Sequence, residues 1–396
     1  MNIKEAKQEI KNTVKAYLLK KEDGSYQIPT IRQRPILLMG APGIGKTQIM
    51  EQIANEMEIG LVAYTITHHT RQSAVGLPRI NEQEYEGRIF SVTDYTMSEI
   101  IASIYRYMKM TGKKEGILFI DEINCVSETL APTILQFLQN KTFGNEAVPQ
   151  GWIICCAGNP PEYNRSVRNF DMVTLDRLRY INVEADYEVW KAYAYQQKVS
   201  GVILSYLELR QKYFYRIQMD VDGLRFVTPR GWEDFSNLLM TYRELDIPVT
   251  VDVAKEFLHD EEVAEDFAVY YGLYNKYKSD YRISEILVGQ AKPDLYERLL
   301  HAEFDERFSV VHLILDALFL HFSKQDEAVS VMLENAFAFI KDAFGEGQEM
   351  VVFVTELSIQ PDAVSYIAKH PSPYYKEYSR LLMMSREKRN LLRELS

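Results

Sequence analysis

The stretch Ile36-Leu-Leu-Met-Gly40-Ala-Pro-Gly-Ile-Gly-Lys46-Thr47 decides the fold of this chain. It joins a short apolar run, typical of a buried parallel strand, to a loop with the spacing Gly-x-x-x-x-Gly-Lys-Thr. Glycines let backbone N–H groups approach phosphate oxygens closely, and the positive end of a following helix adds to the attraction. Residues 47–57 have a helical pattern, so the loop has the strand, loop and helix order that phosphate binding requires.

We therefore predict a bound nucleotide, ATP with Mg²⁺, at this loop. The Lys46 ammonium group would reach the β- and γ-phosphates, and the Thr47 hydroxyl would ligate Mg²⁺. The predicted nucleotide-binding residues are Gly40, Ala41, Pro42, Gly43, Ile44, Gly45, Lys46 and Thr47.

Strand and helix patterns alternate in the first half of the chain. Further apolar runs occupy residues 61–66, 116–120 and 152–157, with helical patterns at 95–110 and 128–140. This order predicts an α/β fold of the P-loop NTPase type, a parallel sheet with helices on both faces. From residue 187 onward the patterns are helical, which predicts an all-α lid followed by an all-α C-terminal region.

The length of 396 residues calls for more than one domain. We expect an amphipathic N-terminal helix and linker at 1–30, the nucleotide-binding domain at 31–185 and the lid at 186–248. Residues 249–396 form a helical region whose role the sequence does not indicate.

The composition narrows the class of partner and the compartment. A formal net charge of −11 disfavours nucleic acid, since a protein that grips a phosphate backbone usually carries a basic surplus. Three cysteines, two of them adjacent in an apolar run, do not form a disulfide framework and fit a reducing compartment. No signal peptide and no apolar run of membrane-spanning length is visible, so we expect a cytoplasmic protein.

Two carboxylates follow the apolar run at 117–120, at Asp121 and Glu122. The carboxyl ends of parallel strands are where α/β sheets bind ligands. Asp121 suits the shell of Mg²⁺, and Glu122 could polarise an attacking water as a general base. An acidic pair that only begins a helix is the alternative, and the loop upstream favours the catalytic interpretation.

Three later residues complete the candidate catalytic set. Asn159 follows the apolar run at 152–157, where an amide could orient the attacking water, although Asn-Pro is also a common turn dipeptide. Arg177 and Arg179 flank a strand-like segment, and an Arg supplied across a subunit boundary can stabilise a transferring phosphoryl group. Arg230 stands after Pro229 near the start of a predicted helix.

In their order along the chain these residues resemble the AAA+ ATPases, most closely the MoxR-like branch. The resemblance identifies Gly40–Thr47 with Walker A, Asp121 and Glu122 with Walker B, Asn159 with sensor 1, Arg177 with the arginine finger and Arg230 with sensor 2. The stretches 70–78 and 141–150 also resemble this branch, the first leading to the helix-2 insert and the second forming a hairpin before sensor 1. Arg179 could replace Arg177 as the finger.

The resemblance implies more than the residues alone do. It implies self-assembly into a ring, a hexamer, with Arg177 acting on the neighbour's nucleotide. It further implies work on a client protein and a partner with a von Willebrand factor A domain, in the maturation of proteins or complexes.

Three other functions stay open. A nucleic-acid-directed AAA+ motor, such as a helicase or restriction subunit, would need a basic surface with aromatic residues. A small-molecule kinase would need an acceptor pocket, and a nucleotide-binding scaffold would not turn ATP over.

Overall fold

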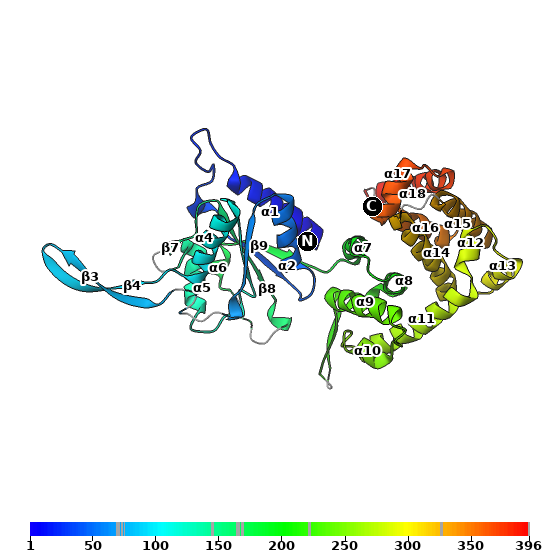
Figure 1. Cartoon of the computed structure of the whole chain (residues 1–396), viewed down its shortest axis with the longest axis horizontal. Helices are drawn as coiled ribbons and strands as arrows, with labels where there is room; N and C mark the ends of the chain where they lie inside the picture. Colours follow the sequence, from blue (N-terminus) through cyan, green and yellow to red (C-terminus); the bar gives the residue numbers. More distant parts are fainter. Residues whose placement is uncertain are drawn as a thin grey trace. The chain divides into compact units, whose positions relative to one another are not determined.

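The computed structural model describes residues 1–68, 72, 74, 76–143, 146–163, 167, 170–220, 223–324 and 328–394. The chain divides into two compact units, Met1–Asp186 and Tyr187–Ser396 (Figure 1). Each unit is described by itself below, first the α/β unit and then the helical unit.

The α/β unit is built on a five-stranded parallel sheet with strand order β2-β5-β8-β1-β9. The strands are β1 (Ile36–Gly40), β2 (Gly60–Thr65), β5 (Gly116–Asp121), β8 (Trp152–Gly158) and β9 (Arg179–Val183). Every residue of β1 and β8 is buried, since both strands are covered on both faces. The apolar runs predicted as strands are therefore confirmed. Strand β1 lies between β8 and β9, and the predicted loop follows it.

Helices cover both faces of this sheet (Figure 1). They are α1 (Ile3–Leu18), α2 (Lys46–Glu56), α4 (Glu99–Thr111), α5 (Ala131–Asn140) and the short α6 (Met172–Leu175). On one face, Leu37, Leu118 and Ile154 share a core with Ile104 of α4 and Phe137 of α5. On the other face, α1 packs against α2 and β9, and α2 packs against β2 and β5.

The N-terminal helix α1 belongs to this unit. Asn2 caps it, and the Glu5 side chain accepts the Asn2 N–H in return, a reciprocal capping pair. Lys7 and Lys11 both pair with Glu56 at the end of α2. The helix ends at Leu18, within the range of 1–30 in which an N-terminal helix and linker were predicted.

An antiparallel hairpin, β3 (Pro78–Tyr85) and β4 (Arg88–Tyr95), projects from the α/β unit (Figure 1). The sequence patterns did not predict it, and the predicted helix at 95–110 begins only at Glu99. Glu86 and Gly87 both have positive φ, as a two-residue hairpin turn of type I′ requires.

Two stretches compared with the MoxR-like branch lie partly outside the described residues. Residues 70, 71, 73 and 75 of the first are outside, as are 144 and 145 of the second. The described part of the second stretch forms the small antiparallel pair β6 (Thr142–Phe143) and β7 (Glu146–Ala147).

The helical unit confirms the predicted change of fold class. Its helices are α7 (Tyr187–Gln196), α8 (Gly201–Leu209), α9 (Pro229–Glu244), α10 (Val251–Lys255), α11 (Glu261–Asp280), α12 (Ile283–Leu287), α13 (Pro293–Leu300), α14 (Phe304–Lys324), α15 (Val329–Phe344), α16 (Gln348–Ile359), α17 (Pro361–Lys369) and α18 (Pro373–Glu394). One feature was not predicted, the antiparallel hairpin of β10 (Arg216–Asp220) and β11 (Gly223–Val227) before α9. None of the helices in the described ranges has the length and apolarity that crossing a membrane requires.

A buried group of charges lies in the core of the helical unit. Lys191 of α7 pairs with Glu208 of α8, at 2.6 Å, and with Glu356 of α16. Tyr195 also donates a hydrogen bond to Glu356. Helices of the predicted lid and of the predicted C-terminal region are thus joined inside one compact unit.

Candidate nucleotide-binding site

The loop between β1 and α2 has a backbone that only glycine allows at several points. Gly43 and Gly45 have φ of 76° and 91°, in the left-handed region. At Gly40 an added Cβ would overlap the carbonyl oxygen of Val183 on the neighbouring strand β9. The glycines therefore set both the turn of the loop and its tight position against the sheet.

Lys46 connects this loop to the end of β8. Its side chain is buried, and Nζ donates to the carbonyl oxygens of Gly40 and Ala41, at 2.8 and 2.7 Å. Nζ also donates to Oδ1 of Asn159, at 2.9 Å. The two predicted site residues are therefore in direct contact although 113 positions separate them.

Thr47 and Asp121 meet in the same way across the sheet. The Thr47 hydroxyl donates to Oδ2 of Asp121 at 2.7 Å, and both side chains are half-buried. Oδ1 of Asp121 accepts the backbone N–H of Glu122 at 2.9 Å. The hydroxyl and the carboxylate thus form a pair of hard oxygen ligands beside the first turn of α2.

Glu122 departs from ordinary strand geometry at the point where β5 ends. Its φ is +54°, an uncommon backbone for a residue with a side chain. Its Oε2 accepts a hydrogen bond from the Thr67 hydroxyl, at 3.1 Å. The carboxylate is therefore held by a residue that follows the adjacent strand β2.

Asn159 is positioned by a second asparagine. Asn124 is buried, and its Nδ2 donates to the backbone carbonyl of Asn159 at 2.8 Å. The backbone N–H of Ile123 also donates to the carbonyl of Ala157, at 2.9 Å. The turn after Glu122 and the end of β8 are thereby locked together.

Thr67 and Asn124 are site-supporting residues that the sequence patterns did not single out. Thr67 reaches Glu122 through strand register, since Thr65 lies opposite Asp121 and Thr67 follows it by two residues, and only the structure shows this register. Asn124 offered none, because a polar residue two positions after Glu122 resembles any turn residue.

The three arginines have different surroundings. Arg177 lies in the turn between α6 and β9, exposed, with its guanidinium donating to Gln139 of α5. Arg179 begins β9 and pairs with Glu9 of α1. Arg230 is exposed in the first turn of α9 and belongs to the helical unit.

The residues present fit Mg²⁺ that arrives with a nucleotide. No group of three or more His, Cys, Asp or Glu ligands that could hold a metal occurs among the described residues. Mg²⁺ typically takes one or two protein oxygens and completes its shell with phosphate and water. Thr47 and Asp121 would supply those oxygens, and the metal would neutralise charge on the phosphates.

A parallel sheet with this loop at the end of β1 and carboxylates at the end of β5 defines a P-loop nucleotide-binding domain. Residues 36–174 match the model of the ATPase family associated with various cellular activities (AAA). No curated protein matches the chain. The chain therefore contains an AAA ATPase domain, and such domains in general bind ATP and hydrolyse it.

Proposed function

We propose that the protein uses ATP hydrolysis to remodel or help mature another protein or complex, as a MoxR-like ATPase. The contacts of Asp121 and Glu122 support the hydrolysis, because a carboxylate held beside a phosphate loop and a metal-ligand pair suits the activation of water, and the remodelling role is proposed from the resemblance. In this scheme Lys46 binds the phosphates, Thr47 and Asp121 hold Mg²⁺, and Glu122 accepts the proton of the attacking water. Asn159 orients that water, and Arg230 contacts the γ-phosphate from the lid.

Arg177 is the better candidate for an arginine that acts on a neighbouring subunit. It is exposed, and its described hydrogen bond is to Gln139, a neutral partner. The Arg179 guanidinium already pairs with a carboxylate, Glu9, of its own unit. Assembly into a closed ring, a hexamer, would bring each Arg177 to the next nucleotide.

Mixed rings test this arrangement. Rings of Arg177→Ala subunits, like rings of Lys46→Ala subunits, should have little ATPase activity. In mixtures, a Lys46→Ala subunit supplies Arg177 to a neighbour whose loop is intact, so part of the activity should return. Steady-state phosphate release across a series of mixing ratios measures this, with native mass spectrometry to count subunits.

Arg179→Ala is the matched control. If Arg177 is the finger, Arg179→Ala rings keep most of their activity without mixing. If instead Arg179→Ala is inactive and rescued while Arg177→Ala is active, the finger is Arg179. No rescue of either variant, in rings of confirmed size, would refute the shared site.

The partners are proposed from the resemblance. We infer a cytoplasmic assembly in which the ring acts on a protein client together with a protein that bears a von Willebrand factor A domain. ATPase rates of the wild-type ring with such a purified protein, with single-stranded DNA and with RNA decide between this and a nucleic-acid motor. Stimulation by DNA or RNA alone would replace the proposal with the motor.

A further inference from the structure

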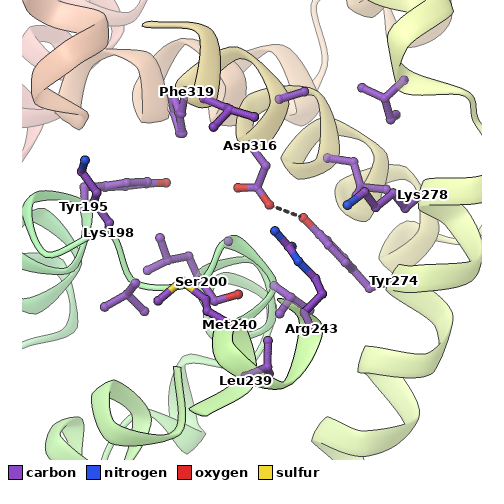
Figure 2. A pocket seen from close by; sticks show the side chains of 18 of the residues that line it. Tyr195, Lys198, Ser200, Leu239, Met240, Arg243, Tyr274, Lys278, Asp316 and Phe319 are labelled. Carbon is purple, nitrogen blue, oxygen red and sulfur yellow. Dashed lines mark hydrogen bonds between the residues drawn. The ribbon is translucent and has the colours of Figure 1, made fainter. Parts of the chain in front are cut away.

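A cavity of about 420 Å³ lies within the helical unit (Figure 2). Its walls come from helices α7, α8 and α9 on one side and α11 and α14 on the other, with Ile283 of α12, Gln360, and Asp362 of α17 also in the lining. The volume lies in the range that small-molecule sites occupy. None of the residues proposed above to bind or hydrolyse ATP lines it.

An acid and a phenol lie together in this cavity. Tyr274 of α11 donates a hydrogen bond to Oδ2 of Asp316 on α14, at 2.7 Å (Figure 2). The Asp316 carboxylate also lies so close to the first turn of α8 that a Cβ on Gly201 would overlap it. Burial raises the pKa of Asp316 to about 6, so this carboxylate is poorly compensated by its surroundings.

Three cationic side chains line the same cavity as this acid, and none of them forms an ion pair with it. Lys198, Arg243 and Lys278 line the cavity and are exposed. Figure 2 shows the Arg243 guanidinium pointing from α9 toward Asp316. Within the ranges that the structure describes, none of the three cations has an ion pair within 4.0 Å. The positive charges of Lys278 and Arg243 nevertheless lower the pKa of Asp316, by less than burial raises it.

A second acid, Asp362, also lines the cavity, and its Oδ2 accepts a hydrogen bond from Nε2 of Gln360 at 3.4 Å. The remaining walls are largely apolar. They include Leu239 and Met240 of α9, Leu313 and Phe319 of α14, and Val202 of α8. A ligand with an apolar body would cover this surface and gain from its removal from water.

The charges restrict what kind of ligand fits. An anion alone could pair with Arg243 and Lys278 but would lie against the Asp316 carboxylate. An amine alone could pair with Asp316 but would lie against the cations. A molecule that carries both groups satisfies both sides, as ion pairs in a partly enclosed site require.

We propose that this cavity binds a small zwitterion with an apolar body, of the α-amino acid class. Its ammonium group lies beside Asp316 and Tyr274, and its carboxylate lies beside Arg243 and Lys278. The proposal concerns the helical unit alone and does not rest on the proposed ATPase function.

Calorimetric titration of the full-length protein with matched probes tests the proposal. L-leucine carries both charges, 3-methylbutylamine lacks the carboxylate, and 4-methylpentanoate lacks the ammonium group. We expect L-leucine to bind at least about tenfold more tightly than either half-ligand, the scale of one charge-assisted hydrogen bond. The proposal would be overturned if either half-ligand bound as tightly as L-leucine. It would also be overturned if L-leucine at millimolar concentration did not bind to folded protein.

Three substitutions locate the site. Arg243→Gln and Asp316→Asn should each weaken L-leucine binding by about tenfold or more. Lys276→Gln, an exposed α11 position outside the cavity lining, should leave it unchanged. Because Arg243 is exposed, its variant should fold even if Asp316→Asn does not, and circular dichroism checks both. Unchanged binding by a folded Arg243→Gln protein would refute the assignment.

Discussion

Lys46 in the α/β unit and Lys191 in the helical unit are both buried, yet their surroundings differ. The Lys46 ammonium group donates to two backbone carbonyls and one amide oxygen, which carry no formal charge. The Lys191 ammonium group pairs with two carboxylates, those of Glu208 and Glu356. Lys46 thus lies in the predicted phosphate loop and contacts its backbone, whereas Lys191 pairs with carboxylates from two other helices.

The two carboxylates also act on the pKa of Lys191. Burial alone would lower it, but the charges of Glu356 and Glu208 outweigh burial and raise the pKa. A lysine held in this way is structural. The helical unit therefore uses the charge of Lys191 to join α7, α8 and α16, whereas Lys46 joins the loop of residues 40–47 to Asn159 in the α/β unit.

The largest expected effect is on turnover in the α/β unit. Glu122→Gln should bind ATP but hydrolyse it about 10²–10³ times more slowly, since the general base is lost while the shape is kept. Nucleotide binding measured by fluorescence titration and phosphate release measured at saturating ATP separate the two steps. Unchanged turnover would favour a nucleotide-binding scaffold and remove the contrast between the units.

The next largest effect is on the stability of the helical unit. Lys191→Met leaves the buried Glu356 without its cation, which should cost about 3–5 kcal/mol of unfolding free energy. Thermal and urea unfolding measure the loss. The double variant Lys191→Met, Glu356→Gln should recover part of it, because the uncompensated charge is gone. A single variant as stable as the wild type would show that these charges do not hold the helices together.

A smaller effect is expected from a methyl group at the end of β8. In Gly158→Ala, the new Cβ would lie 2.6 Å from Oδ1 of Asn124 and 2.9 Å from Sδ of Met39. Displacing Asn124 should free Asn159, lower turnover and cost about 1–3 kcal/mol of stability.

Gly272→Ala in α11 is the matched control, since its Cβ meets nothing within 4 Å. It should leave turnover unchanged and add up to about 1 kcal/mol of stability. Normal turnover in Gly158→Ala would argue against a positioning role for Asn124.

The smallest expected effect is a pH dependence in the helical unit. Burial lowers the pKa of His312 from 6.5 to about 4, and burial raises that of Asp316 from 3.8 to about 6. Between pH 6.5 and 4 the unfolded chain gains a proton at the His312 position that the folded chain does not, so acid destabilises the fold there. Between pH 6 and 4 the folded chain gains a proton at Asp316 that the unfolded chain does not, so acid stabilises it.

The two groups should therefore be separable by substitution. His312→Gln should weaken the loss of stability on acidification, and Asp316→Asn should strengthen it. Each change in slope should be at most about 1.4 kcal/mol per pH unit, the value for one proton. Urea unfolding from pH 7 to 4 measures it, and slopes that change in the same direction would contradict the opposite environments of the two residues.

The sequence predicted the local backbone of the candidate site where neighbours in the chain are neighbours in space. The loop 40–47 and the pair Asp121 and Glu122 lie in short contiguous stretches whose glycines and apolar runs fix the local backbone. The arrangement of Lys46 with Asn159, and of Thr47 with Asp121, follows because the carboxyl ends of the strands of one parallel sheet lie at the same edge.

The pattern of apolar and polar residues gave a weaker signal for the hairpin β3–β4. The β3–β4 strands expose much of their surface, including Ile80 and Ile89, so they show no clean alternation of apolar and polar residues. Their Glu86-Gly87 turn is also a weaker signal than Asn-Gly.

By itself, the sequence determined the α/β class, the phosphate loop, the carboxylates and the change to helices after residue 187. Those features depend on local backbone preference and on the period of apolar residues. Only the tertiary structure placed Thr67 against Glu122, Asn124 against Asn159, and Lys191 between Glu208 and Glu356. Each of these contacts joins separate elements, so it depends on strand register or helix packing, which no short stretch of sequence encodes.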